Sequence, residues 1–154
     1  MNLWDWAVAA YGAPGVADAC LTLQDHHEQN VPLLLWSAWI AQTGRRPDEE
    51  TIEAACDTAR AWDGVVTAPL RAVRRTLKAP VPDIDDEPRE AVRQRIKAVE
   101  LEAEKHLLAA LEALAPAPGG PPRPVIDGLA ATTRVWSRVT PRPALVRLAE
   151  ALPA

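Results

Sequence analysis

One stretch of the chain, residues 31–43, constrains the fold more than any other. It reads Val-Pro-Leu-Leu-Leu-Trp-Ser-Ala-Trp-Ile-Ala-Gln-Thr, follows Asn30 and precedes Gly44. Asn is a good helix N-cap and Gly a common C-cap, so the stretch is predicted to be one helix. Its apolar side chains would point in nearly every direction. A helix that is apolar on all sides must be covered on all sides, so we predict it at the centre of the fold.

The elements that cover this helix are also predicted to be helices. Ala and Leu, the best helix formers, dominate the 154-residue chain, and no β-branched run of strand length occurs. Apolar residues recur every three or four positions, which is typical of amphipathic helices. The helices of the predicted bundle cover residues 3–11, 14–27, 31–43, 48–62, 67–78 and 89–114. The fold class is therefore an all-α, irregular bundle of about six helices, followed by a short helical C-terminal tail.

The chain is expected to divide at residues 116–124. This segment reads Pro-Ala-Pro-Gly-Gly-Pro-Pro-Arg-Pro, a composition typical of a linker and poor at forming a helix. We therefore expect a helical domain over residues 1–115 and a basic, weakly helical tail over residues 125–154. Because the linker separates the tail from the long helices, the tail should be dispensable for folding.

Charge is unevenly distributed along the chain, whose net charge is −4. Residues 1–66 carry three bases and ten acids, whereas residues 116–154 carry five bases and two acids. The acidic first part argues against general nucleic-acid binding, which needs a basic face. The basic tail could contact the acidic part of the chain or an acidic partner.

The sequence indicates a cytoplasmic protein that does not cross a membrane. The N-terminal residues lack the basic region and apolar run of a signal peptide. No stretch of about eighteen apolar residues is present. The two cysteines, Cys20 and Cys56, are far apart and are expected to be free thiols in a reducing compartment.

Charged residues fall on the apolar faces of two predicted helices. At about 100° per residue, Glu100 lies inside the apolar stripe of helix 89–114, and Glu104 lies at its margin. Arg74 lies equally close to the centre of the stripe of helix 67–78. An unpaired buried charge is strongly unfavourable, so we expect Arg74 and Glu100 to pair, with Glu104 and Arg71 nearest to them.

These inward charges have two main interpretations, besides simple solvation at the surface. They could form a buried Arg–Glu network that fixes the register of the two helices. Alternatively, they could line a pocket for an anionic ligand, because guanidinium groups suit phosphate or carboxylate. The candidate ligand-binding residues of that second interpretation are Arg71, Arg74, Arg75, Lys78, Glu100 and Glu104.

Other potential sites are weaker, and we predict no catalytic residue, metal site or cofactor. Residues 25–28 read Asp-His-His-Glu, but adjacent residues on a helix point about 100° apart and make poor joint ligands. Glu102 and His106 lie four apart without the matching Glu-x-x-His pair of a di-iron bundle. Cys20 and Cys56 fall on inner helix faces, where cysteine is commonly a small hydrophobe.

Several short segments together resemble a known family. They are Leu-Trp-Asp-Trp-Ala at 3–7, Pro-Gly-Val-Ala at 14–17, Leu-Thr-Leu-Gln-Asp at 21–25, Val-Pro-Leu-Leu-Leu-Trp at 31–36, Pro-Leu-Arg-Ala-Val-Arg-Arg at 69–75 and Glu-Leu-Glu-Ala-Glu at 100–104. In combination they resemble a proteobacterial family of the DUF2390 type, named only as a domain of unknown function, over about residues 2–114. The resemblance implies a cytoplasmic location and a fold, but no mechanism.

The sequence favours binding over catalysis. A domain of this size without a catalytic constellation is more often an interaction or adaptor domain, so a protein partner is expected. The alternative is an anionic-ligand or enzyme-type site lined by Arg71, Arg74, Glu100 and Glu104. A weaker alternative is nucleic-acid association through the basic tail. Partner identity and oligomeric state do not follow from the sequence.

Overall fold

The computed structural model describes all 154 residues and confirms the all-α class. It contains eight α-helices, one π-helical turn and no strands. The elements are α1 (Leu3–Tyr11), α2 (Val16–His27), α3 (Val31–Gln42), α4 (Glu49–Trp62), the π-helical turn η1 (Asp63–Thr67), α5 (Ala68–Thr76), α6 (Asp86–Leu114), α7 (Val125–Trp136) and α8 (Arg142–Ala151). None of the helices combines the length and the apolar character that crossing a bilayer requires.

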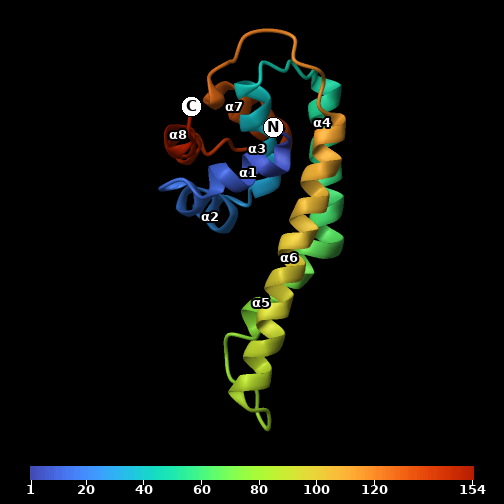
Figure 1. Cartoon of the computed structure of the whole chain (residues 1–154), viewed down its shortest axis with the longest axis vertical. Helices are drawn as coiled ribbons and strands as arrows, with labels where there is room; N and C mark the ends of the chain where they lie inside the picture. Colours follow the sequence, from blue (N-terminus) through green and yellow to red (C-terminus); the bar gives the residue numbers. More distant parts are fainter.

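The molecule has a compact part and a projecting part (Figure 1). Helices α1, α2, α3, α7 and α8 cluster together, while α4, η1 and α5 run antiparallel to α6 as a long pair. The far end of this pair extends beyond the compact part, and residues 77–85 close it. We call α5, residues 77–85 and the first part of α6, residues 86–102, the arm.

Helix α3 lies at the centre of the fold, as the sequence predicts. All its residues from Val31 to Ala41 are buried, including Trp36 and Trp39. Helices α1, α2, α4, α6 and α7 all contact it. The Asn30 side chain caps its N-terminus by accepting a hydrogen bond from the Leu33 N–H at 3.0 Å. Five helices therefore cover the apolar surface of α3.

The C-terminal helices belong to the same core, which corrects the expectation of a dispensable tail. Leu129 of α7, Leu145 and Leu148 of α8, and Leu152 are buried in one cluster with α3. Residues 1–115 leave one side of α3 uncovered, and α7 packs on it. The contact is close at Gly128, where an added Cβ would lie 2.8 Å from the Ser37 carbonyl oxygen.

The linker segment is non-helical, as predicted, but it is tied to the loop that follows α3. The Gly119 and Gly120 N–H groups donate to the Gly44 carbonyl at 2.9 and 3.1 Å. The Arg45 guanidinium donates to the Pro116 carbonyl at 2.7 Å. Gly44 has φ 68°, and a Cβ there would lie 1.9 Å from the Gly120 oxygen, so only glycine fits. The linker therefore fixes where α7 starts.

Helices α4 and α5 form one continuous rod, although the sequence predicted a break near Gly64. The π-helical turn keeps helical backbone angles, and the Ala68 N–H donates to the Asp63 carbonyl five residues earlier. Pro69, which has no N–H to donate, follows this turn directly as the second residue of α5. In place of the predicted break, the helix continues, and its hydrogen bonds change locally from a four-residue to a five-residue spacing. Helix α6 begins at Asp86, three residues before the predicted start.

The arm has almost no core of its own. Helix α5 has no buried residue, and the first buried residue of α6 is Ala103. Val92 and Val99, which lie along the apolar stripe of α6 by their helical spacing, are 51% and 46% exposed. The stripe is therefore buried only over the second half of α6, where α3 and α4 cover it.

Truncation after Ala115 should abolish cooperative unfolding. It removes four fully or nearly fully buried leucines and exposes one side of α3. Each buried leucine contributes roughly 1.5–3 kcal/mol, so the combined loss approaches the entire stability of a typical domain. Thermal melts followed by circular dichroism would measure it. A sharp thermal transition in the 1–115 fragment would show that residues 1–115 fold cooperatively without α7 and α8.

Candidate functional site

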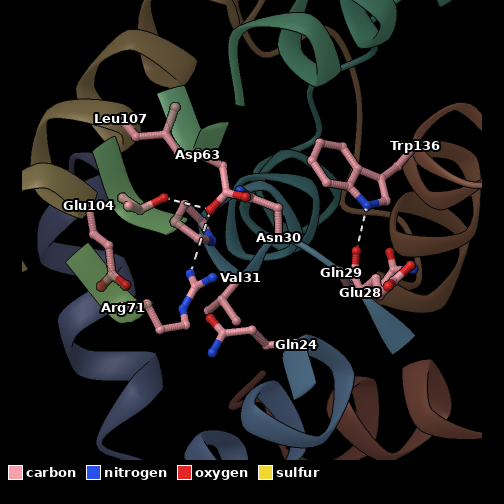
Figure 2. Close-up of a pocket in the computed structure, with 12 residues that line it drawn as sticks. Gln24, Glu28, Gln29, Asn30, Val31, Asp63, Arg71, Glu104, Leu107 and Trp136 are labelled. Carbon is pink, nitrogen blue, oxygen red and sulfur yellow. Dashed lines mark hydrogen bonds and ion pairs between the residues drawn. The ribbon is translucent and has the colours of Figure 1, made fainter. Parts of the chain in front are cut away.

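A polar cleft of about 240 Å³ lies where the end of α2, the start of α3, η1, α5, α6 and α7 meet (Figure 2). These elements are far apart in the sequence, and the burial of α3 brings them together. Most of the side chains that line the cleft are polar or charged. Those that determine its chemistry are Gln24, Asn30, Asp63, Arg71, Glu104 and Trp136.

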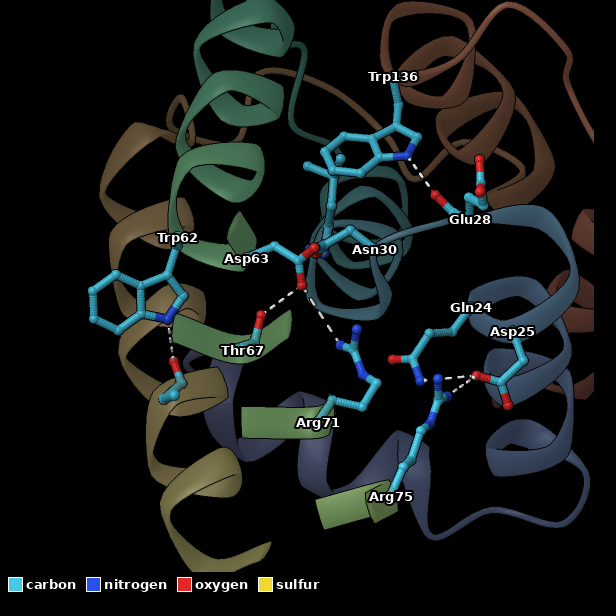
Figure 3. A network of polar contacts seen from close by, with 12 residues as sticks. Gln24, Asp25, Glu28, Asn30, Trp62, Asp63, Thr67, Arg71, Arg75 and Trp136 are labelled. Atoms are coloured by element: carbon cyan, nitrogen blue, oxygen red, sulfur yellow. Dashed lines mark hydrogen bonds and ion pairs between the residues drawn. The ribbon is translucent and has the colours of Figure 1, made fainter. Parts of the chain in front are cut away.

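One wall of the cleft comes from η1 and α5. Asp63, Thr67 and Arg71 are spaced by four residues and lie on one side of the rod. The Thr67 hydroxyl donates to Asp63 Oδ1 at 2.5 Å, and Arg71 Nη2 lies 3.5 Å from the same oxygen (Figure 3). Asp63 therefore holds the Arg71 guanidinium against this wall.

The other wall comes from the turn between α2 and α3 and from the end of α7. Glu28 ends α2 in the left-handed region, with φ 53°, and its carbonyl accepts a hydrogen bond from Trp136 Nε1 at 2.9 Å. The Arg60 guanidinium of α4 stacks on the Trp136 ring, 4.1 Å from its centre. The indole is thus fixed at both its nitrogen and its face.

Glu104 is the unusual residue of the cleft. Its carboxylate points toward the space beside Arg71, but it makes no hydrogen bond or ion pair with the protein (Figure 2). Burial, and then the negative charge of Glu100, raise the pKa of Glu104, while Arg71 and Arg74 oppose the rise. A half-buried carboxylate without a partner is unfavourable in the ionised form.

The predicted pair of Arg74 and Glu100 is confirmed. Arg74 Nε donates to Glu100 Oε2 at 2.6 Å, and the two side chains are only 20% and 14% exposed. The pair joins α5 to α6 next to the cleft without lining it. This position matches the first interpretation, a charge pair that fixes the register of two helices.

The six candidate ligand-binding residues do not share one pocket. Arg71 and Glu104 line the cleft, whereas Arg74 and Glu100 pair with each other. Arg75 reaches across to Asp25 of α2 at 2.8 Å, in a largely exposed contact (Figure 3). Lys78 is exposed beyond the end of α5.

The charge balance of the cleft favours a cation over an anion. Three carboxylates line it, those of Glu28, Asp63 and Glu104, against the single guanidinium of Arg71. In addition, Arg71, Arg74 and Arg75 each already contact a carboxylate. The arginines that the sequence offered as anion ligands are therefore compensated within the chain.

The two cysteines and the histidines lie outside the cleft. Cys20 and Cys56 are buried, and burial raises the pKa of Cys20 to about 12 and that of Cys56 to about 11. Both thiols therefore stay protonated at neutral pH and are poor nucleophiles. No group of three His, Cys, Asp or Glu side chains is placed to hold a metal ion.

Sequence reasoning missed most of the cleft. The spacing of Asp63, Thr67 and Arg71 by four residues is a signal that could have joined them. Gln24, Asn30 and Trp136 carry no comparable signal, because α2, α3 and α7 meet only in the folded chain.

The fold and the cleft define an all-α protein with a small, acidic, polar cleft at the junction of its helices. The chain belongs to the family described as "Protein of unknown function (DUF2390)", which matches residues 2–111. The matched region ends within α6, so α7 and α8 lie outside it, although α7 supplies Trp136 to the cleft. No curated protein and no solved structure matches the chain.

The Arg74–Glu100 pair should contribute measurably to stability. Removing one partner leaves the other charge largely buried and unpaired. Arg74→Met or Glu100→Leu should therefore each lower the free energy of unfolding by about 3 kcal/mol, the lower end of the range for breaking a buried ion pair. The double variant should lose much less. Urea melts of the four proteins give the coupling energy.

Arg75→Met is the matched control for this cycle. Its exposed contact with Asp25 should be worth less than about 1 kcal/mol. If Arg74→Met and Glu100→Leu melt like the wild type, the pair is solvated and does not fix the helix register.

Glu104→Gln should stabilise the protein at neutral pH. Because its pKa is raised on folding, the native state binds more protons than the unfolded state between the ordinary and the raised value. Wild-type stability therefore falls as the pH rises through that interval, and Gln removes the loss. Urea melts at about pH 4 and about pH 8 should show the gain only at the higher pH. Lower stability of Glu104→Gln at pH 8 would mean that the carboxylate has a partner in solution.

Proposed function

We propose that this protein is a non-enzymatic interaction domain whose cleft receives a positively charged side chain of a protein partner. The observation that carries the proposal is Glu104, a half-buried carboxylate that faces a cavity and has no partner in the chain. A lysine or arginine side chain entering the cleft would supply the missing charge. Binding and the relief of an unfavourable buried charge would then be the same event.

The surrounding groups suit such a side chain. Asp63 faces the same space as Glu104, and the Gln24 and Asn30 amides line the cleft beside them. Gln24 donates its amide N–H to Asp25, so its oxygen can accept from a bound cation, whereas the Asn30 oxygen already caps α3. A cavity of about 240 Å³ has room for one long side chain. The Trp136 ring borders the cleft and offers apolar contact to an aliphatic stem.

Arg71 sets the selectivity of the proposed site. It is the only base that lines the cleft, and Asp63 holds it against the wall of η1 and α5. In that position it limits the total negative charge without neutralising Glu104. The cleft would therefore accept one cationic group, because a second would be repelled by the positive charge of Arg71.

A blocked lysine, Nα-acetyl-lysinamide, should raise the melting temperature of the wild-type protein. Binding to the native state alone stabilises it by mass action, by about 2.7 kcal/mol at one hundred times Kd. Glu104→Gln should lose this response, whereas Glu87→Gln, at the exposed start of α6, should keep it. Thermal melts over a ligand titration measure the effect.

Inorganic phosphate is the opposing probe. If phosphate raises the melting temperature while the lysine derivative does not, the cleft is an anion site and the proposal fails. An equal response of the wild type and Glu104→Gln to the lysine derivative would also contradict it, because the ligand would then bind elsewhere.

A further inference from the structure

The outer face of α6 in the arm carries an unusual combination of residues. Val92 and Val99 lie seven residues apart, hence on nearly the same side of the helix, and both are about half exposed. Arg95 and Glu102, also seven apart, lie beside them, within about 80° of Val92 at 100° per residue. We call these four residues the α6 outer face.

The charges of this face have little to bind within the chain. Arg95 is exposed and takes part in no ion pair. The Glu102 side chain is 70% exposed, and its ion-pair contact is with His106 of the same helix, at 3.8 Å. By contrast, Glu100 and Glu104 point toward Arg74 and the cleft. The α6 outer face is therefore separate from the cleft.

We propose that the α6 outer face pairs with the same face of a second copy of this chain, with the two α6 helices antiparallel. Arg95 lies three residues before Ala98, and Glu102 lies three residues after Val99. A twofold axis through the midpoint between Ala98 and Val99 therefore places Arg95 of each copy opposite Glu102 of the other. One contact between identical faces thus satisfies all four charges, as a closed twofold interface requires.

The apolar residues fit the same arrangement. Val99 lies next to the axis, so the two copies of Val99 would cover each other. Val92 would lie near His106 of the second copy, one turn beyond the ion pairs. A shallow apolar depression lined by Trp62, Val65, His106 and Ala110 continues this face toward α4. Burial of apolar surface would supply affinity, and the ion pairs would set direction and register.

This inference goes beyond the proposed cation-binding function and does not rest on it. No residue of the α6 outer face lines the cleft. Binding of the lysine derivative and pairing of two copies can therefore succeed or fail independently.

Charge reversal on the full-length chain tests the pairing. Sedimentation velocity should give a dimer for the wild type and monomers for Arg95→Glu and for Glu102→Arg, because each single change places like charges opposite each other. An equimolar mixture of the two variants should restore a particle of twice the monomer mass, since every pair is again of opposite sign. Lys97→Glu, an exposed reversal two residues from Arg95 on another side of α6, should remain dimeric.

Three outcomes would overturn the proposal. They are a monomeric wild type, single variants that still dimerise, and a mixture that stays monomeric while each variant keeps its helical circular dichroism signal. The rescue by mixing separates a lost interface from a misfolded chain, because misfolded variants would not recover by pairing.

Discussion

The other helices of the compact part are arranged around α3, which is buried along almost its whole length. Its residues from Val31 to Ala41 are covered all round, and no single neighbouring helix could do this. Five helices contact it, and one of them, α7, comes from beyond the proline-rich linker. Because α3 must be covered on its last side, the chain returns to it after leaving the long α6. The hydrogen bonds from the linker to Gly44 fix that return.

Helix α6 has one apolar stripe along its length, but it belongs to both the core and the arm. From Ala103 onward its apolar stripe is buried against the core, and before Ala103 it continues into the arm with its valines half exposed. The arm has no fully buried residue, and polar contacts help to join α6 to α5 and to Leu77 just beyond it. The Arg74–Glu100 pair is one, and another is the hydrogen bond from Arg89 to the Leu77 carbonyl at 2.5 Å. The two valines of this part of α6 stay about half exposed, and the proposed pairing of two copies is argued from them.

The cleft follows from how the helices meet. The π-helical turn places Asp63, Thr67 and Arg71 in one row, and the left-handed residue Glu28 turns the chain from α2 into α3. The cleft lies between these two features. Glu104 enters this space from α6 without finding a partner. Glu104 is therefore a carboxylate without a hydrogen-bond or ion-pair partner in the chain, and the proposed function is argued from this observation.

Most of the helices, the central position of α3 and the pairing of Arg74 with Glu100 could be predicted from the sequence. Helical periodicity and capping are local, and a charge on an apolar face needs a partner of opposite sign wherever the helix packs. Only the tertiary structure decided that α7 and α8 belong to the core and that Arg71 and Glu104 share a cleft with Asp63 and Trp136. It also decided that the first half of α6 is left uncovered. An apolar stripe shows that a face can be buried, but what covers it depends on contacts between residues far apart in the chain, and no local pattern encodes these.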